Sequence, residues 1–539
     1  MRIGASATAD LGSRDQVESD QRVLAASPQP AGIRQLVGLV GCVAVCDVTV
    51  YRGEGFAGAA VLFLLSPALL WLSARRSVHG RGLVLIGVMF VLLAGRMVWQ
   101  GSDGLVLMGF ALLVPFSMLL TGFRIEPLAM ARFAMGIGWF GGKGLIDSGK
   151  QFRIHALLPR APWIKVVFPA LALIVFGTIF VQANPRLLTW VFESLARAVQ
   201  RLQEWLDWVS PQLLEAFFWL FVTWIVLGLV WRDGGRAGVD EAAAAPVPDD
   251  TRQPMPAHVY AAFRNTLLAV NLLFAGYLIY EFATLWFREF EEGFHYSGYA
   301  HEGAVWLTVA LGLATLVLGL VFRGGTEADA RLSVLKRLAW TWSSLNGLLA
   351  LAVYNRLLIY IDFNGLTPMR IVGLFGITTV VVGLVLVVRK IAGARSFAWL
   401  VHRQLVALSL AIFLFALTPV DAIWVDFNVD RILSGDLAPA VQLSVHRFGP
   451  EGVPRLVPGL ECRDETIREG IRALLAEHHE QLGARVRTRR ELGWTTWQLA
   501  EQRALEALEE HRGLFQRYAE PQTRQRVRLR FDEYTYQWY

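Results

Sequence analysis

Residues 82–100 read GLVLIGVMFVLLAGRMVWQ, and residues 104–122 read GLVLMGFALLVPFSMLLTG. A bilayer core about 30 Å thick needs about 20 apolar helical residues to cross it. Only helices and closed barrels satisfy their backbone hydrogen bonds inside lipid. The two stretches therefore predict a pair of transmembrane helices joined by a short connection, and they place the chain among integral membrane proteins.

Stretches of the same kind recur along the chain, and together they predict about eleven transmembrane helices in an all-α polytopic membrane protein. The predicted spans are 33–51, 54–74, 82–100, 104–122, 163–183, 212–231, 263–286, 304–322, 338–361, 371–388 and 403–420. The composition agrees, since 54% of the residues are hydrophobic and 18% are charged, against about 25% charged in soluble domains.

The distribution of Lys and Arg predicts the orientation. With the N-terminus inside, the inner connections hold 22 Lys and Arg residues and the outer ones hold six. Cytoplasmic loops are enriched in these residues, so we expect a cytoplasmic N-terminus, and the odd span count places the C-terminus outside. We expect a multi-pass protein of the cell (inner) membrane, a plasma membrane of a bacterial cell, with the lipid bilayer as its surroundings.

The chain divides into five predicted parts. These are a disordered cytoplasmic leader (1–31), an N-terminal six-helix membrane half (32–232), a flexible cytoplasmic linker (233–257), a C-terminal five-helix membrane half (258–420) and an extracytoplasmic, mostly helical domain (421–539). The last part has 17 Arg, no Lys and 19 Asp plus Glu. This part is close to neutral, so the excess of basic residues lies in the membrane part. There it indicates membrane topology, and we expect no nucleic-acid partner.

Periodicity predicts local structure in three further places. Apolar residues at spacings of three and four predict helices over 464–482 and 488–518, whereas the alternation of Arg and apolar residues over 526–531 predicts a strand. Residues 123–162 predict short helices at the inner membrane surface, bent at glycines. Residues 186–209 predict an amphipathic helix on the outer interface.

Several short motifs resemble nucleotide-binding or catalytic patterns, but the surrounding sequence lacks the elements that those patterns require. Gly136, Gly138 and Gly141 have dinucleotide-loop spacing, and Gly144, Gly149 and Lys150 approach a phosphate loop, but neither set follows a strand. His479 and Glu480 begin a zinc-protease pattern that Gly483 interrupts. Cys42 and Cys46 fit helix packing better than a metal site. The sequence therefore predicts no catalytic residues, no metal and no cofactor.

Ionisable residues inside membrane helices are costly and often functional, and here they gather near the predicted outer face. We expect a polar cluster there, either an ion-pair clasp that fixes helix packing or a binding site, and pairing of Arg356 with Glu302 and Asp362 at its centre. The candidate residues are Arg356, Glu302, His301, Asp362, Asn355, Tyr299, Arg96, Glu281 and Asp47.

Five segments resemble an uncharacterised family of bacterial polytopic membrane proteins, domain of unknown function 4173 (4153-type). They are RNTLLAVNLLFAGYLIYE (264–281), HYSGYAHEG (295–303), YNRLLIYIDFNGLTPMRI (354–371), DFNVDRILSG (426–435) and GPEGVPRL (449–456). The resemblance covers roughly residues 260–460 and implies a polytopic membrane architecture without implying an activity.

Three functions stay open. The sequence favours a non-enzymatic envelope sensor or scaffold that binds an envelope protein through residues 421–539. A transporter or channel that uses the outer polar residues is the alternative. An enzyme acting on lipid-linked substrates, with His301 and Glu302 as acid or base, has the least support. Substrate and oligomeric state are not predicted.

Overall fold

The structure is a computed structural model, and it describes residues 32–74, 80–151, 211–231, 257–283, 332–393 and 395–538, with single residues between 193 and 313. All the regular elements in these ranges are helices. The few residues described within the predicted amphipathic helix at 186–209 are also helical.

Nine of the described helices are long and apolar enough to cross a membrane. They are α2 (Ile33–Cys46) with its π-helical extension Asp47–Tyr51, α3 (Phe56–Ser73), α4 (Arg81–Gln100), α5 (Asp103–Thr121), α9 (Pro211–Val230), α11 (Ala257–Glu281), α13 (Leu332–Asn364), α14 (Pro368–Ala392) and α15 (Phe397–Leu417). They coincide with nine of the predicted spans. The predicted span 163–183 lies outside the described residues, and only five residues of 304–322 are described, all of them helical.

The loop after α5 differs from its prediction. Instead of several short helices, one 25-residue helix, α6 (Pro127–Gln151), occupies most of it. Its glycines lie inside this continuous helix. A Cβ at Gly141 would lie 2.1 Å from the Trp224 carbonyl oxygen, and Trp224 Nε1 donates to the Gly138 carbonyl at 2.8 Å. These glycines therefore let α9 approach the backbone of α6 closely, which accounts for them without a nucleotide.

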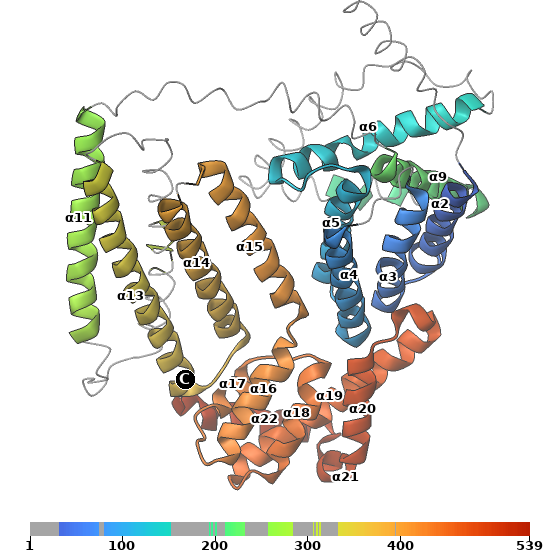
Figure 1. Ribbon diagram of the computed structural model, residues 1–539. Helices are drawn as coiled ribbons and strands as arrows, with labels where there is room; N and C mark the ends of the chain where they lie inside the picture. Colours follow the sequence, from blue (N-terminus) through green and yellow to red (C-terminus); the bar gives the residue numbers. More distant parts are fainter. Residues whose placement is uncertain are drawn as a thin grey trace, which may run out of the picture. The chain divides into compact units, whose positions relative to one another are not determined.

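The helices form two compact units. The first contains residues 1–46, 65–79 and 136–232, and the second contains 47–64, 80–135 and 233–539. In the first unit α2 packs against α9. In the second unit α11, α13, α14 and α15 pack in sequence order, while α4 packs against α5 (Figure 1).

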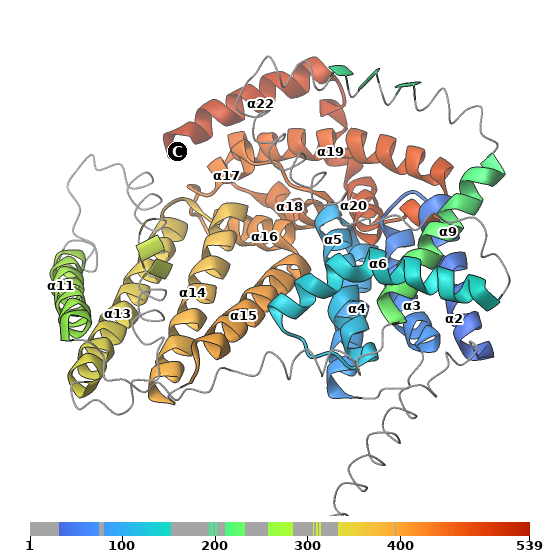
Figure 2. The same cartoon turned by 90° about the horizontal axis from the view of Figure 1, so that it is seen from above.

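The C-terminal region begins with α16, after two residues that follow α15, and all its regular elements as far as Trp538 are helices. Its longer helices are α16 (Val420–Leu433), α17 (Ala440–Val445), α18 (Val453–Leu456), α19 (Glu465–Leu492), α20 (Leu499–Glu510), α21 (Arg512–Phe515) and α22 (Pro521–Thr535). α19 runs on past residue 482, so the predicted break there is wrong, and the predicted helix at 488–518 is divided by turns. Figure 2 shows α22 running alongside α19, with which it makes extensive contacts.

The predicted strand at 526–531 is wrong, because these residues belong to α22. Val527 packs on the core and Phe531 is fully buried, one helical turn apart. Arg526 and Arg530 are exposed on another face. The alternation of Arg and apolar residues is thus compatible with a period of 3.6, and a short window does not separate the two periods.

The hydrophobic core of this region continues into the membrane helices. Trp424, Ile471 and Phe531 share one buried cluster with Leu357 of α13 and Ile371 of α14. The C-terminal helices therefore pack on the end of the bundle where α13 turns into α14 (Figure 1). We call this end of the second unit the junction face.

Candidate functional site

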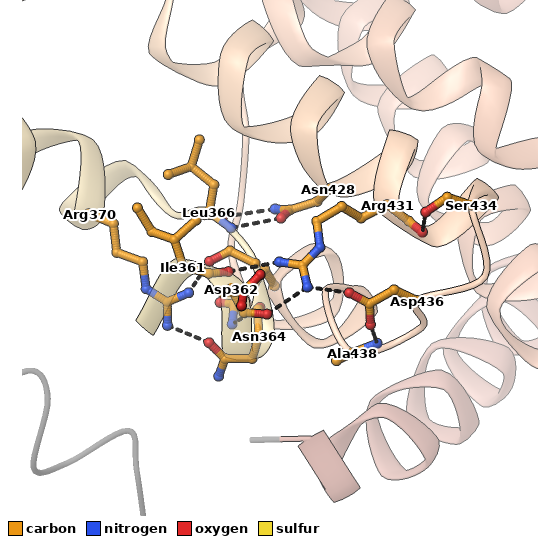
Figure 3. A network of polar contacts seen from close by, with 12 residues as sticks. Ile361, Asp362, Asn364, Leu366, Arg370, Asn428, Arg431, Ser434, Asp436 and Ala438 are labelled. Carbon is orange, nitrogen blue, oxygen red and sulfur yellow. Dashed lines mark hydrogen bonds and ion pairs between the residues drawn. The ribbon is translucent and has the colours of Figure 1, made fainter. Parts of the chain in front are cut away.

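The turn between α13 and α14 is held by the C-terminal helices (Figure 3). Gly365 has a φ of +97°, a conformation that glycine adopts without steric cost. The buried Asn428 of α16 donates to the Leu366 carbonyl and accepts from the Leu366 N–H, at 2.8 Å in both cases. Gln442 Nε2 donates to the Asn364 carbonyl at 2.9 Å. The turn therefore depends on residues that follow it by more than sixty positions.

Two arginines complete this turn. Arg370, at the start of α14, donates to the Gly365 carbonyl and, at 2.6 Å, to Asn364 Oδ1. Its guanidinium lies over the Tyr360 ring, 3.6 Å from the centroid. Arg431 donates to the carbonyls of Ile361 and Asp362 at 2.8 and 2.6 Å, and it pairs with Asp436. We call Asn364, Gly365, Leu366, Arg370, Asn428 and Arg431 the turn network.

A buried ion pair joins α11 to α13 inside the predicted membrane spans. Arg356 Nε and Nη2 donate to the two carboxylate oxygens of Glu281, each at 2.5 Å. Tyr277 donates to Glu281 Oε2 at 2.7 Å and accepts from Arg356 at 3.2 Å. The side chains of Arg356 and Glu281 are 4% and 3% exposed. Bidentate geometry and burial make this a pair in which each charge offsets the desolvation of the other.

A second ion pair joins α4 to the C-terminal region. Arg96 forms two hydrogen bonds to the carboxylate of Glu451, the second at 3.1 Å. The Glu451 side chain is 1% exposed. Burial raises the pKa of the Glu451 carboxyl above its ordinary value, and the Arg96 guanidinium acts in the opposite direction. Nearby, Asp421 accepts from the Gly449 N–H at 2.8 Å and from Trp424 Nε1 at 3.2 Å.

The segment 493–498 of the C-terminal region touches two further connections of the bundle. The Glu54 N–H donates to Thr495 Oγ1 at 3.2 Å. Gln498 accepts from the Gly101 N–H and donates to the Met97 carbonyl at 3.0 Å. The C-terminal helices therefore contact the connections 52–55, 101–102 and 365–367, and all three lie on the junction face.

Three of the candidate residues that the structure describes form ion pairs with different partners. Arg356 pairs with Glu281, Arg96 pairs with Glu451, and Asp47 pairs with Arg52 at 2.9 Å. Asp362 is exposed, and its backbone carbonyl accepts from Arg431. Asn355 is half-buried. The other candidates, Tyr299, His301 and Glu302, lie outside the described residues, so the pairing of Arg356 with Glu302 stays a prediction.

Several site residues were missed from the sequence. Glu451, Asn428 and Arg431 lie in segments that resemble the family, and a Glu between prolines and glycines in GPEGVPRL was a usable signal. The predicted topology places Arg370 in an outer connection, which indicates its charge and no partner. No sequence pattern identifies Gln498, because its role depends on its tertiary contact with the connection at Gly101.

These hydrogen bonds and ion pairs join helices and turns to one another. The carboxylates of Glu281, Glu451 and Asp436 pair with guanidinium groups, and the Asp421 carboxylate accepts from the Gly449 N–H and from Trp424 Nε1. In the described part of the chain, no three His, Cys, Asp or Glu side chains converge as a metal site would require. Burial lowers the pKa of the His446 imidazole, and the nearby Arg370 guanidinium adds to that shift.

A family model described as a domain of unknown function (DUF4153) matches residues 48–458. The chain belongs to the DUF4153 family. Of the two numbers that the sequence resemblance suggested, 4153 is correct. No curated protein and no solved structure matches the chain. The DUF4153 match includes the turn network and both buried ion pairs, whereas segment 493–498 lies beyond it.

Proposed function

We propose that this chain is a non-enzymatic membrane scaffold or sensor whose residues 421–539 form an extracytoplasmic docking domain. The observation that carries the proposal is the attachment of this region to the bundle. It bonds to three helix connections and shares a hydrophobic core with α13 and α14. A domain attached at several points transmits a displacement to the helices, whereas a domain on a flexible tether does not.

The path of the chain supports an outer position for this domain. The chain leaves the junction face at Asp103 and returns to it at Asn364, so it crosses the bilayer an even number of times in between. The helices α5, α9, α11 and α13 account for four crossings. The predicted spans 163–183 and 304–322 therefore contribute either two crossings or none. The chain then crosses the bilayer eleven or nine times in total. Both totals are odd, so the C-terminal region lies on the side opposite the N-terminus.

Charge then favours one orientation. On the side opposite the junction face, Arg389 and Lys390 lie in the last turn of α14, Arg395 lies in the connection to α15, and Arg403 lies in the second turn of α15. On the junction side, Arg370 lies in the first turn of α14 and Arg52 in the connection 52–55, whereas the connections 101–102 and 365–367 hold no Lys or Arg. By the positive-inside rule, the junction face lies outside the cytoplasm, with the N-terminus inside, and the inner membrane of a bacterial cell is the setting we propose.

Photo-crosslinking in the cell tests the docking role. A benzoylphenylalanine is placed in the full chain at Leu514, Leu529 or Tyr536, which are 48%, 57% and 69% exposed. We expect neighbouring positions to yield the same discrete adduct with an envelope protein. A matched position at Leu107, 70% exposed on α5 within a span, should yield none. The absence of a protein adduct at all three positions would contradict the proposal.

A transporter is the second candidate, and the Glu281–Arg356 pair inside the spans favours it, because buried ionisable residues in membrane helices often mark ion pathways. Full-chain proteoliposomes loaded with a pH-sensitive dye provide the test. Ion or proton flux that the doubly neutral variant Glu281→Gln with Arg356→Met abolishes, while the protein stays folded, would favour transport over the scaffold; the double change leaves no uncompensated buried charge.

A further inference from the structure

The end of α19 and the turn that follows it carry an unusual combination of residues on the C-terminal region. Arg485, Arg487, Arg489 and Arg490 occupy the last two turns of α19. The exposed apolar side chains Leu492, Trp494 and Trp497 follow directly, at 50%, 55% and 42% exposed. This combination is typical of segments that meet a bilayer surface.

The contacts of residues 493–498 indicate where this segment lies relative to the membrane–water boundary. Thr495 accepts from the Glu54 N–H, and a Cβ at Gly55 would lie 2.7 Å from Thr496 Cα. The segment therefore presses on the connection between the first two membrane spans, and Gln498 holds the connection between the next two. Connections of two to four residues between spans lie at the membrane–water boundary. Trp494 and Trp497 consequently sit at the level where tryptophan is enriched in membrane proteins.

Arg489 and Arg490 line a small cavity, and Arg485 and Arg487 lie beside it in the last two turns of α19. Glu501, whose side chain is 5% exposed, pairs with Arg489 at 2.7 Å and with Arg485 at 3.6 Å. Arg490, Trp494 and Trp497 line the same cavity as Arg489 and Glu501. The guanidinium of Arg489 has five N–H donors. The pair with Glu501 is made by Nη1, so the other nitrogens are the ones that a ligand would use. Arg487 and Arg490 are exposed and have no ion-pair partner in the described part of the chain.

The size and charge of this cavity select its ligand. Its volume of about 190 Å³ is below the roughly 300–1,000 Å³ of sites that enclose whole small molecules. A phosphate headgroup fits if the rest of the ligand stays in the bilayer. Guanidinium groups bind phosphate oxygens in bidentate geometry, and the indoles supply the apolar side. We propose that residues 485–502 form an interfacial site for the headgroup of an anionic phospholipid.

Lipid binding to the full chain, delipidated in a nonionic detergent, tests this site. Native mass spectrometry measures binding of dioctanoyl phosphatidylglycerol and dioctanoyl phosphatidylcholine, with inorganic phosphate as a competitor. We expect phosphatidylglycerol to bind more tightly than phosphatidylcholine. Arg487→Gln with Arg490→Gln should weaken phosphatidylglycerol binding about 25-fold, or about fivefold per arginine, the equivalent of about 1 kcal/mol for each cation at a membrane surface.

The matched control is Arg526→Gln with Arg530→Gln, which removes two exposed arginines of α22 in the same region and should leave binding unchanged. Trp494→Ala with Trp497→Ala should weaken both lipids without changing competition by phosphate. Equal binding of the two lipids would overturn the proposal. So would an equal loss in the α22 control, or phosphate that binds as tightly as phosphatidylglycerol, since the site would then be elsewhere or would take a soluble anion.

Discussion

Asn428 and Leu366 form a two-way hydrogen bond in which the side-chain amide pairs with the backbone N–H and carbonyl of Leu366, at 2.8 Å in both directions. Asn428 is fully buried. The pair joins the first helix of the C-terminal region to the turn between two membrane helices, so it couples the two parts more directly than apolar packing does.

Asn428→Asp should therefore loosen this attachment. The carboxylate cannot donate to the Leu366 carbonyl, and an unsatisfied buried group costs about 1–3 kcal/mol. The readout is the temperature at which buried Cys462 reacts with a thiol dye, in a full chain with Cys42→Ser and Cys46→Ser. Gln525→Glu, the same change on the exposed face of α22, is the control. Equal labelling temperatures for the two variants would show that the bond is dispensable.

Gly365→Ala should act at the same place by a different mechanism. A Cβ at this residue would lie 2.3 Å from Asn428 Oδ1, and the φ of +97° is unfavourable for alanine. We expect a loss of at least about 1 kcal/mol in the same labelling assay. Gly376→Ala is the matched control in α14, because a Cβ there meets nothing within 4 Å. The idea fails if Gly365→Ala labels no earlier than Gly376→Ala.

Single removal of either charge in the Glu281–Arg356 pair should be strongly destabilising. Breaking one partner of a buried pair costs about 3–5 kcal/mol, because the other charge is left uncompensated. Glu281→Gln and Arg356→Met should each reduce folded protein in fluorescence-detected size exclusion. Glu281→Arg with Arg356→Glu should recover part of it. A swap no better than the single variants would argue against direct pairing.

The sequence-based pairing of Arg356 with Glu302 has its own test. If Glu302 shares the guanidinium with Glu281, Glu302→Gln should lower the yield of folded protein, and a swap with Arg356 should restore it. The same assay measures both. A Glu302→Gln variant that behaves like the parent chain would leave Glu281 as the carboxylate that matters.

We expect His478 to make the C-terminal region less stable in acid. Burial lowers the pKa of its imidazole from 6.5 to about 4, and the ring lies against Phe448 at a centroid distance of 4.5 Å. The unfolded state therefore binds a proton between pH 6.5 and 4 that the folded state does not. The stability from this residue is complete above pH 6.5 and decreases as the pH falls, by about 3 kcal/mol at pH 4.

Denaturant titrations monitored by Cys462 labelling at pH 7 and pH 5 measure this loss. His478→Gln should flatten the decline, because glutamine does not titrate. His511→Gln, on a half-buried histidine after α20, is the control and should leave the decline intact. A decline of the same slope in His478→Gln would assign the acid sensitivity to other groups.

Much of the membrane fold was predictable, because span length and hydropathy are local properties. The nine described helices begin and end within six residues of the predicted bounds. The candidate site was predictable only in part. Arg356 and Arg96 were identified as costly charges inside spans, but their carboxylate partners lie 75 and 355 positions away, and hydropathy carries no information about such pairings.

The sequence alone determined which segments are long and apolar enough to enter a bilayer, because the cost of exposing an unbonded backbone or a charge to lipid depends on residues close in the chain. The tertiary structure decided how charges pair, how the turn at Gly365 is held, and that residues 526–531 form a helix rather than a strand. Those outcomes depend on contacts between distant segments. The energy of a buried ion pair or a shared hydrogen bond exists only once both partners are in place.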